Sequence, residues 1–466
     1  MSHTVPMTRE ATPQTRRGLV LALACAAGGM VGLDTAIVNV ALPSIQHEFG
    51  VGHSTLQWIV VAYGLLLGGF LLFGGRMTDQ WGRRRVFVVG LAIFTGASFV
   101  AGAAQDAGLL IGARAVQGFG AALVAPAALS LLAVTFAEGR DRNRALGLFG
   151  AVRGAAGSVG VVASGLLAAG PGWRWSFFIN IPAGVVFMVL AMVFLAKDRP
   201  AERTTRLDVA GATTVTGGLL LFVYALHHAA NHGWVSVSTV VLFGVSAAML
   251  AAFVRIEIRS AAPLVPPATV RNRTLVAANV TAFLAFSALL SFIFIASLLM
   301  QDELGYSPIR TGLSWLATTA TIVATSMIAA RLTARFGVRW LLIGGLSLVA
   351  VGTLWLTRVP ADATYVVDLL PAFLLAGIGF GLCGPAVQIG ALSGVPSSES
   401  GLASGLMETT REIGGAAGVA VVSTVLVAGS GLAGFHTAFT FIVVLAVLGM
   451  ITAAIGFTAR ERNSHG

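Results

Sequence analysis

Six charged side chains stand inside long apolar stretches of this sequence, where a charge needs a partner or a function. They are Asp34, Arg114, Arg153, Glu408, Arg411 and Glu412. Each costs roughly 2.5–3.5 kcal/mol at the centre of a membrane helix on insertion scales. Buried carboxylates can take up and release protons, and neighbouring arginines control when they do so. The chemistry indicated by these residue types is proton carriage across a membrane.

Asp34 and Arg114 have the same predicted depth. Asp34 stands eight residues before the end of the apolar run 18–42, and Arg114 stands eight residues after Asp106, where the run 107–132 begins. At about 1.5 Å per residue, both lie about 12 Å from the same membrane face. Equal depth makes a pair of Asp34 and Arg114 geometrically possible. Two interpretations stay open: a pair that opens when a proton neutralises Asp34, and a permanent ion pair that joins two helices.

Glu408 and Glu412 lie one helical turn apart on the same face, and Arg411 follows Glu408 by three residues. Two close, desolvated carboxylates do not both ionise easily, so one of them is expected to hold a proton. Arg411 opposes this effect, and Arg153 from a related helix could neutralise one acid permanently. The pattern therefore allows a second proton carrier or a static cluster of four charges.

The elements that position these charges are apolar runs. Of the 466 residues, 56% are hydrophobic and 10% are charged, against about 25% charged in soluble domains. Most of the runs reach the roughly 20 residues that cross a bilayer as a helix. Fourteen runs are expected to span the membrane: 18–42, 55–75, 86–104, 107–132, 144–168, 175–196, 209–227, 235–254, 274–299, 310–330, 338–357, 366–391, 401–428 and 434–458.

The arginines sort to one side of the predicted membrane. With the N-terminus inside, only Arg174, Arg310 and Arg358 fall in outer loops, which places both termini in the cytoplasm of a multi-pass cell-membrane protein. The net charge of +10 therefore does not indicate nucleic-acid binding. The polar N-terminal residues precede an apolar run that is too long for a cleaved signal. Cys25 and Cys383 lie inside apolar runs and predict no disulfide.

An internal repeat divides the chain. The stretch 76–82 is echoed by 331–337, and glycines, a proline and an arginine of spans 4 and 5 recur in spans 12 and 13 at nearly the same offset. We expect an all-α major-facilitator-type layout of two six-helix halves plus two inserted helices. The predicted boundaries are a tail at 1–17, bundles at 18–197 and 274–458, inserted helices at 208–255 and a tail at 459–466.

A glycine-rich basic loop joins spans 2 and 3. Gly75 allows close helix packing, Asp79 can sit near a helix N-terminus or an arginine, and Gly82 permits a positive-φ turn. Arg83, Arg84 and Arg85 follow. We interpret the loop as a conformational clasp on the cytoplasmic face; the alternative is an ordinary basic loop.

Enzymatic chemistry has little support in the sequence. The only lysine, Lys197, does not stand in a phosphate-binding loop. The glycine pattern 379–384 lies in an apolar run and predicts helix packing. His227, His228 and His232 flank a loop, where a polar surface is favoured over a metal site. No cofactor or metal is expected.

The loop and the charged spans resemble the major facilitator superfamily, within it the fourteen-span drug:proton antiporter family of multidrug exporters. The stretches 34–43, 110–122, 173–182 and 401–415 carry the resemblance. It implies a role in proton coupling for Arg114. The usual proline and one glycine are missing at 160–165. Glu412 replaces a usual glutamine, and Arg153 and Glu408 add charge, so the substrate is expected to differ from lipophilic cations.

The expected function is proton-driven export of a drug or antibiotic by a protein that works as a monomer, with the small molecule, protons and the bilayer as partners. The open alternatives are a metabolite uptake or symport carrier and a non-transporting membrane protein. Polar and aromatic residues in the spans are candidates for lining the substrate cavity. They are Asn39, Trp58, Tyr63, Phe286, Phe292, Trp315 and Gln388.

Overall fold

The computed structural model is helical throughout the long segments that it describes. It describes residues 14–137, 139–169, 172–196, 209–260, 263, 265, 272–393, 395–396, 399–429 and 431–457. The helices are α1 (Gln14–Phe49), α2 (His53–Trp81), α3 (Arg83–Gly102), α4 (Ala107–Thr135), α5 (Arg140–Ala169), α6 (Trp175–Phe178), α7 (Asn180–Phe194), α8 (Val209–His232), α9 (Val237–Arg259), α11 (Arg273–Leu298), η1 (Leu299–Glu303), α12 (Pro308–Leu356), η2 (Tyr365–Leu369), α13 (Leu370–Leu392), α14 (Ser400–Ala428) and α15 (Gly431–Gly456). Most of the expected tail 1–17 and all of 459–466 lie outside the described residues.

Among the described residues, 12 helical segments are long and apolar enough to cross a membrane. Two observations bear on the difference from the fourteen spans expected from sequence. α5 has 30 residues and is not among the 12. α12 has 49 residues, more than twice the length of one crossing, and its backbone leaves the helical conformation at Gly337.

The break in α12 repeats the turn between α2 and α3. Gly82 has φ 99° and ψ 144°, and Gly337 has φ 83° and ψ 160°. An L side chain is strained at such φ values, so glycine is required at both places. The positive-φ turn expected at Gly82 is therefore confirmed, and the related stretch 331–337 ends in the same backbone geometry.

Glycines set the closest helix contacts. A Cβ on Gly118 of α4 would overlap the backbone of Tyr63 in α2, and one on Gly120 would approach Phe94 of α3. In α13, Gly377 faces Thr318 in the first part of α12, and Gly379 faces the part beyond Gly337. The glycine pattern 379–384 thus contributes to helix packing, as the apolar context predicted.

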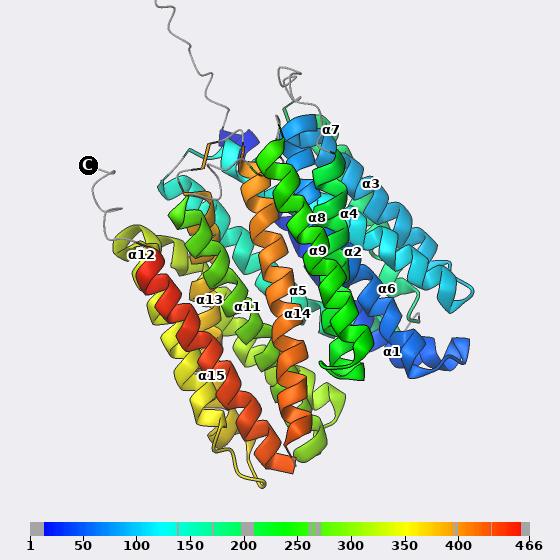
Figure 1. The fold of residues 1–466 in the computed structure, drawn as a ribbon, viewed down its shortest axis with the longest axis vertical. Coiled ribbons are helices and arrows are strands. Elements are labelled where there is room, and N and C mark those ends of the chain that lie inside the picture. The colour runs from blue at the N-terminus through cyan, green and yellow to red at the C-terminus, as the bar shows by residue number, and fades with distance from the viewer. Residues whose placement is uncertain are drawn as a thin grey trace, which may run out of the picture.

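Figure 1 shows α1–α4, α6 and α7 on one side of the molecule and α11, α12, α13 and α15 on the other, with α5 and α14 in the middle. We call α1–α7 the N-terminal group and α11–α15 the C-terminal group. Between them α8 packs against both α2 and α14, and α9 packs against α8. The inserted position of this helix pair is visible beside α14 in the same view. α4 is central, since 83% of its membrane window is buried, whereas α9 is peripheral, with 11% buried.

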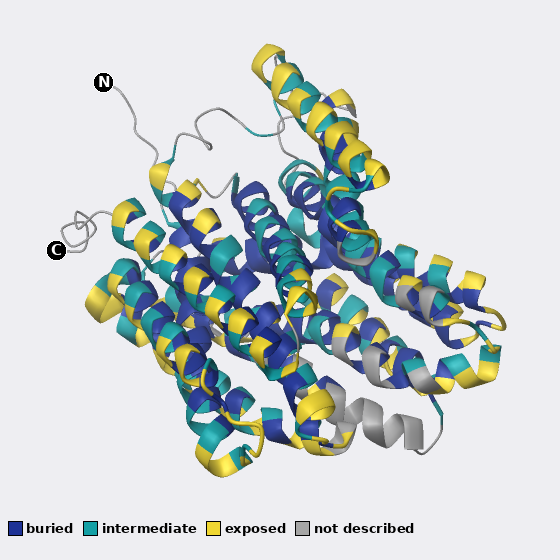
Figure 2. Cartoon of the chain, turned by 60° about the horizontal axis from the view of Figure 1, so that its bottom comes forward, coloured by how far each residue is buried: buried dark blue, intermediate teal, exposed yellow. Residues whose placement is uncertain are grey.

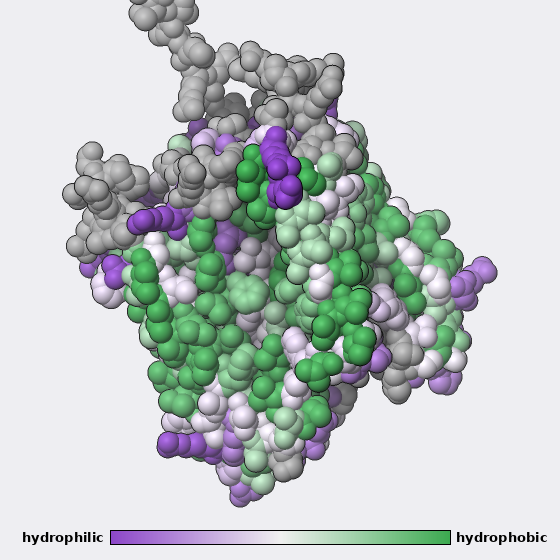
Figure 3. Space-filling model, in the orientation of Figure 1, coloured by the Kyte–Doolittle hydropathy of each residue, from purple (hydrophilic) through white to green (hydrophobic). Residues whose placement is uncertain are grey.

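The outer surface is apolar where lipid would contact it. Figure 2 shows buried residues gathered within the bundle and exposed residues on the outward faces of the helices. In Figure 3 hydrophobic residues form a broad band between hydrophilic residues at the two ends of the view. Exposed valines such as Val193 on α7 and Val241 on α9 belong to this surface. Such a surface is stable in a bilayer and not in water.

Candidate functional site

The pair of Asp34 and Arg114 is present and fully buried. Arg114 Nη1 lies 2.6 Å from Asp34 Oδ2, and the two side chains are 1% and 0% exposed. Arg114 Nε also donates to the carbonyl oxygen of Ile59 at 3.2 Å, which fixes the guanidinium against α2. Tyr63 lies beneath it, with the guanidinium carbon 4.0 Å from the ring centroid. The pair therefore joins α1 and α4, and α2 supports it.

Two amides complete the shell of Asp34, and the sequence analysis missed both. Gln117 Nε2 and Asn180 Nδ2 each donate to Asp34 Oδ1 at 2.8 Å. Gln117 also donates to Ser98 Oγ at 2.9 Å and accepts from Arg114 Nη1 at 2.7 Å. Side chains from α4 and α7 thus meet at the carboxylate of Asp34 in α1, and Ser98 of α3 holds Gln117 in place. Gln117 stands three residues after Arg114, a spacing that could have shown it, and Asn180 lies in the stretch 173–182 that carries the family resemblance.

A second charged cluster joins the two groups of helices. Arg153 Nη1 of α5 lies 2.6 Å from Glu408 Oε2, and Arg411 Nη1 lies 2.7 Å from Glu408 Oε1. Glu408 is 1% exposed, and each of its carboxylate oxygens pairs with one arginine. The Arg411 guanidinium lies over the ring of Phe286 in α11, 3.8 Å from its centroid. Arg153 is thus the residue that neutralises an acid across the interface, as one interpretation anticipated.

Glu412 has a different environment. In the described part of the chain its side chain makes no hydrogen bond or ion pair, and its exposure is intermediate. A Cβ on Gly68 of α2 would lie 3.9 Å from the Glu412 Cβ and the same distance from Val223 of α8. The inserted helix α8 therefore packs beside this acid. Arg153 and Arg411 form their ion pairs with Glu408 and act on Glu412 only electrostatically, so Glu412 is the less constrained acid.

The clasp residue Asp79 binds the N-terminus of a helix in the other group. Its Oδ1 accepts from Gly401 N at 2.9 Å and its Oδ2 accepts from Leu402 N at 2.7 Å. These are orphan amides in the first turn of α14, whose own N-cap, Glu399, makes no capping hydrogen bond. A carboxylate at this position also interacts favourably with the helix dipole. The contact joins α2 to α14.

Glycine makes this approach possible. A Cβ on Gly75 would overlap the carbonyl oxygen of Gly401 and lie 2.9 Å from the Cα of Gly405. Two further hydrogen bonds join the groups at the same end: Ser130 Oγ to Ser400 Oγ at 2.8 Å, and Arg142 Nη2 to Leu392 O at 3.0 Å. We call this region, where α2 ends and α14 begins, the clasp end.

The clasp arginines contact their own group of helices. Arg83 Nε donates to Ser130 Oγ at 3.4 Å, and Arg84 Nη2 donates to the carbonyl oxygen of Met192. Both make further interactions as well. Asp79 has hydrogen bonds that reach the C-terminal group directly.

The candidate cavity residues fall into three environments. Tyr63 stacks on the buried Arg114 and Phe286 on the partly buried Arg411, whereas Trp58 is 38% exposed and stacks on Tyr224 of α8. Phe292 is fully buried and packs with Trp315, which itself stacks on Phe373, so these rings belong to the interior of the C-terminal group.

Gln388 and Asn39 need separate mention. Gln388 is 2% exposed, its Oε1 has no hydrogen-bond partner among the described residues, and it faces Gly150 of α5. Gln388 thus places a buried acceptor between α5 and α13. The side chain of Asn39 lies outside the part that the structure describes.

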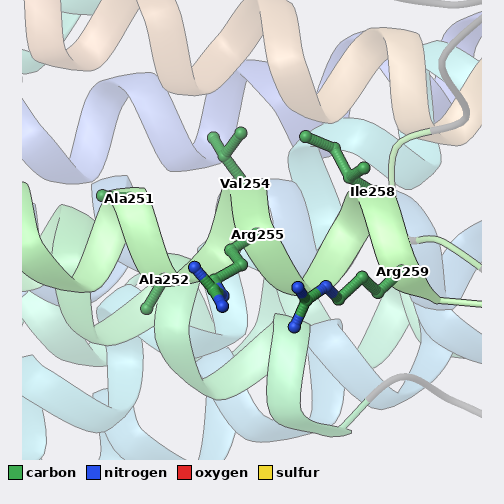
Figure 4. A pocket seen from close by; sticks show the side chains of 6 residues that line it. All are labelled: Ala251, Ala252, Val254, Arg255, Ile258 and Arg259. Atoms are coloured by element: carbon green, nitrogen blue, oxygen red, sulfur yellow. The ribbon is translucent and has the colours of Figure 1, made fainter.

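A surface hollow lies on the peripheral helix α9. Figure 4 shows it lined by Ala251, Ala252, Val254, Arg255, Ile258 and Arg259, all from α9. Its walls come from one peripheral helix, so it is not a transport site. No group of three or more metal-binding side chains occurs among the described residues. The imidazoles of His228 and His232 stack on each other, with their ring centroids 4.0 Å apart.

Known proteins resemble this chain in sequence and in overall fold. A family model described as Major Facilitator Superfamily matches residues 24–419 and 275–466. A puromycin resistance protein of Streptomyces alboniger is 39% identical over 416 residues, covering 89% of this chain and 82% of that protein. A cephamycin export protein of Amycolatopsis lactamdurans is 38% identical over 418 residues, covering 89% and 85%. The crystal structure of a human organic anion transporter has the same fold, with a TM-score of 0.68 at 17% identity over 95% of this chain and 100% of that one.

Proposed function

Because this chain belongs to the major facilitator superfamily and is a multi-pass membrane transporter rather than an enzyme, we propose that it exports a drug or antibiotic in exchange for protons. Relatives named as resistance and export proteins support the direction of transport. The observation that carries the proton coupling is the buried Asp34–Arg114 pair, 2.6 Å apart. A carboxylate at this depth is retained against a cost of roughly 2.5–3.5 kcal/mol, which a functional role accounts for.

The two acids of α14 take separate roles in this proposal. Glu408 is held by two arginines, so its protonation would leave two partly buried cations without a full partner. Glu412 has neither contact and lies next to α2 and α8. We therefore assign proton carriage to Asp34 first and Glu412 second, with Arg114 as the partner of Asp34. Glu408, Arg153 and Arg411 hold the interface between the two groups.

The driving force is sufficient for export. A proton that crosses a potential near 150 mV supplies roughly 3.5 kcal/mol, at about 2.3 kcal/mol per 100 mV. At about 1.4 kcal/mol for each tenfold ratio, one proton sustains a substrate gradient of roughly a few hundredfold.

The fold supports a body that rocks between two open states. We propose fourteen spans, with α5 and both parts of α12 each crossing once. The two six-helix bundles are residues 18–197 and 274–458, and the inserted pair is 208–255. Arginine placement puts the clasp end and both termini in the cytoplasm. Asp79 then holds the cytoplasmic side closed while the cleft faces outward, and a substrate site lies between the bundles near Gln388, Phe286 and Trp58.

Efflux in inverted membrane vesicles tests the function. The first probes are puromycin and a cephamycin, the compounds that appear in the names of two relatives. Substrate uptake into energised vesicles together with proton movement out of them is expected, and Asp34→Asn and Glu412→Gln should each abolish the proton-driven part. Asp362→Asn, in an exposed loop, is the control. Proton and substrate moving in the same direction would indicate symport, and wild-type rates in both variants would remove the carrier assignment.

A further inference from the structure

Asn180 has a position that the proposed proton cycle does not yet use. It is 2% exposed, it begins α7, and its Nδ2 donates to Asp34 Oδ1 at 2.8 Å. In the part of the chain that the structure describes, this is the one hydrogen bond of its amide. An asparagine amide can donate from nitrogen or accept at oxygen, so a half turn reverses its role without changing its shape.

The other partners of Asp34 cannot reverse in this way. Arg114 carries donors only. Gln117 is fixed at both ends of its amide: Oε1 accepts from Arg114 at 2.7 Å, and Nε2 donates to Ser98 at 2.9 Å as well as to Asp34. A protonated Asp34 has a hydroxyl that needs an acceptor in this buried site. Among these partners, Asn180 is the one that can supply it.

We propose that Asn180 is a positioning residue that reads the protonation state of Asp34, donating to the carboxylate and, after a half turn of its amide, accepting from the acid. This inference rests on the proposed function of Asp34 as a proton carrier. No bond other than the hydrogen bond is exchanged, and the proton stays on Asp34.

Asn180 lies where a change in its hydrogen bond affects how α7 is held against α1. α1 is tied to the α6–α7 segment at two levels. At the deeper level Asp34 meets Asn180. Near the end of α1, Glu48 accepts from Trp173 Nε1 at 2.7 Å and pairs with Arg174 at 2.5 Å. Neutralisation of Asp34 removes the charge that strengthens the deeper hydrogen bond and leaves the tie at Glu48 intact, so it changes how α7 is held against α1.

Infrared titration of the purified protein, in detergent and without substrate, tests this directly. The carboxylic-acid band that disappears in Asp34→Asn reports protonation of Asp34. In Asn180→Leu, which can neither donate nor accept, the midpoint should move to higher pH by about one unit, the size expected for losing one hydrogen bond to a charged acceptor. The band itself should move to higher wavenumber, because the acid has lost its acceptor.

Two further variants keep the result interpretable. Asn180→Asp should move the midpoint upward by at least as much, since two carboxylates would then share one proton. Asn279→Leu, a buried asparagine of α11 that bonds Leu275 and Thr410, should leave the midpoint unchanged. An unshifted midpoint in Asn180→Leu and Asn180→Asp, or no titration of Asp34 in the wild type, would overturn the inference. Because the titration needs no transport, a shifted midpoint beside efflux that ignores protons would defeat the proposed function alone.

Discussion

The carboxylate of Asp79 caps a helix to which Leu402 belongs, although the two residues are 323 positions apart in the sequence. The bond from Leu402 N to Asp79 Oδ2 is 2.7 Å long. It satisfies a backbone amide that the first turn of α14 cannot satisfy itself. A single side chain therefore couples the end of α2 to the start of α14, and opening the clasp end must break this contact.

Removing the cap should shift the equilibrium between the closed and open clasp end. Asp79→Ala loses two hydrogen bonds to backbone amides and a favourable dipole interaction, together worth about 1–2 kcal/mol, which is a 5- to 30-fold change in population. We expect slower turnover and greater labelling of a cysteine placed near the clasp end. Asp141→Ala, an exposed acid in the first turn of α5, is the matched control. Unchanged turnover and labelling in Asp79→Ala would contradict the clasp.

Gly75→Ala should prevent full closure of the same end. The added methyl group would overlap the carbonyl oxygen of Gly401, and backbone cannot move aside cheaply. Overpacking of this kind costs about 1–3 kcal/mol. Export of a substrate should fall while the amount of folded protein in the membrane stays close to wild type. Gly96→Ala in α3 has open space around its new Cβ and should export normally; equal rates in the two variants would argue against closure through Gly75.

The two glutamates of α14 should fail in different ways. Glu408→Gln leaves the partly buried Arg153 and Arg411 without their carboxylate, so the melting temperature should fall, by the equivalent of at most about 3–5 kcal/mol. Glu412→Gln removes no described ion pair and should leave the melting temperature nearly unchanged while it abolishes proton coupling. Thermal unfolding monitored by intrinsic fluorescence, read beside vesicle efflux, separates the two roles. Similar stability losses in both variants would show that Glu412 is also structural.

Glu48 should make a small acid-sensitive contribution to stability. Arg174 and Trp173 donate to its carboxylate and hold the pKa of that carboxyl below its usual range. A lowered pKa in the folded state gives stability that is present above the unfolded pKa, about 4.3, and is lost as the pH falls through the folded value. The side chain is 44% exposed, so solvent screening limits the gain to less than about 1 kcal/mol.

The measurement is the melting temperature of wild type and Glu48→Gln between pH 7 and pH 3. The two proteins should differ by a few degrees at most at pH 7 and converge in acid. A difference that grows as the pH falls would have the wrong sign and would contradict the assignment.

Much of this protein could be predicted from local sequence. Hydropathy located the helices to within a few residues for most spans, because each side chain that contacts lipid must be apolar. The turn at Gly82 followed from its neighbours, since only glycine adopts φ 99° without strain. The equal depth of Asp34 and Arg114, which depends on helical rise alone, made their pairing geometrically possible.

The partners of the charges were decided by tertiary structure. Equal depth does not say which helices are neighbours, so Asn180, 146 residues from Asp34, could not be placed beside it. Spacing put Glu408 and Glu412 on one face as equals, but the approach of α5 gave Arg153 to Glu408 and left Glu412 apart. The sequence by itself determined which residues carry charge into the membrane and how deep they lie. Only the packing of helices decided which of those charges are satisfied, because ion pairs and amide contacts require atoms within about 3 Å.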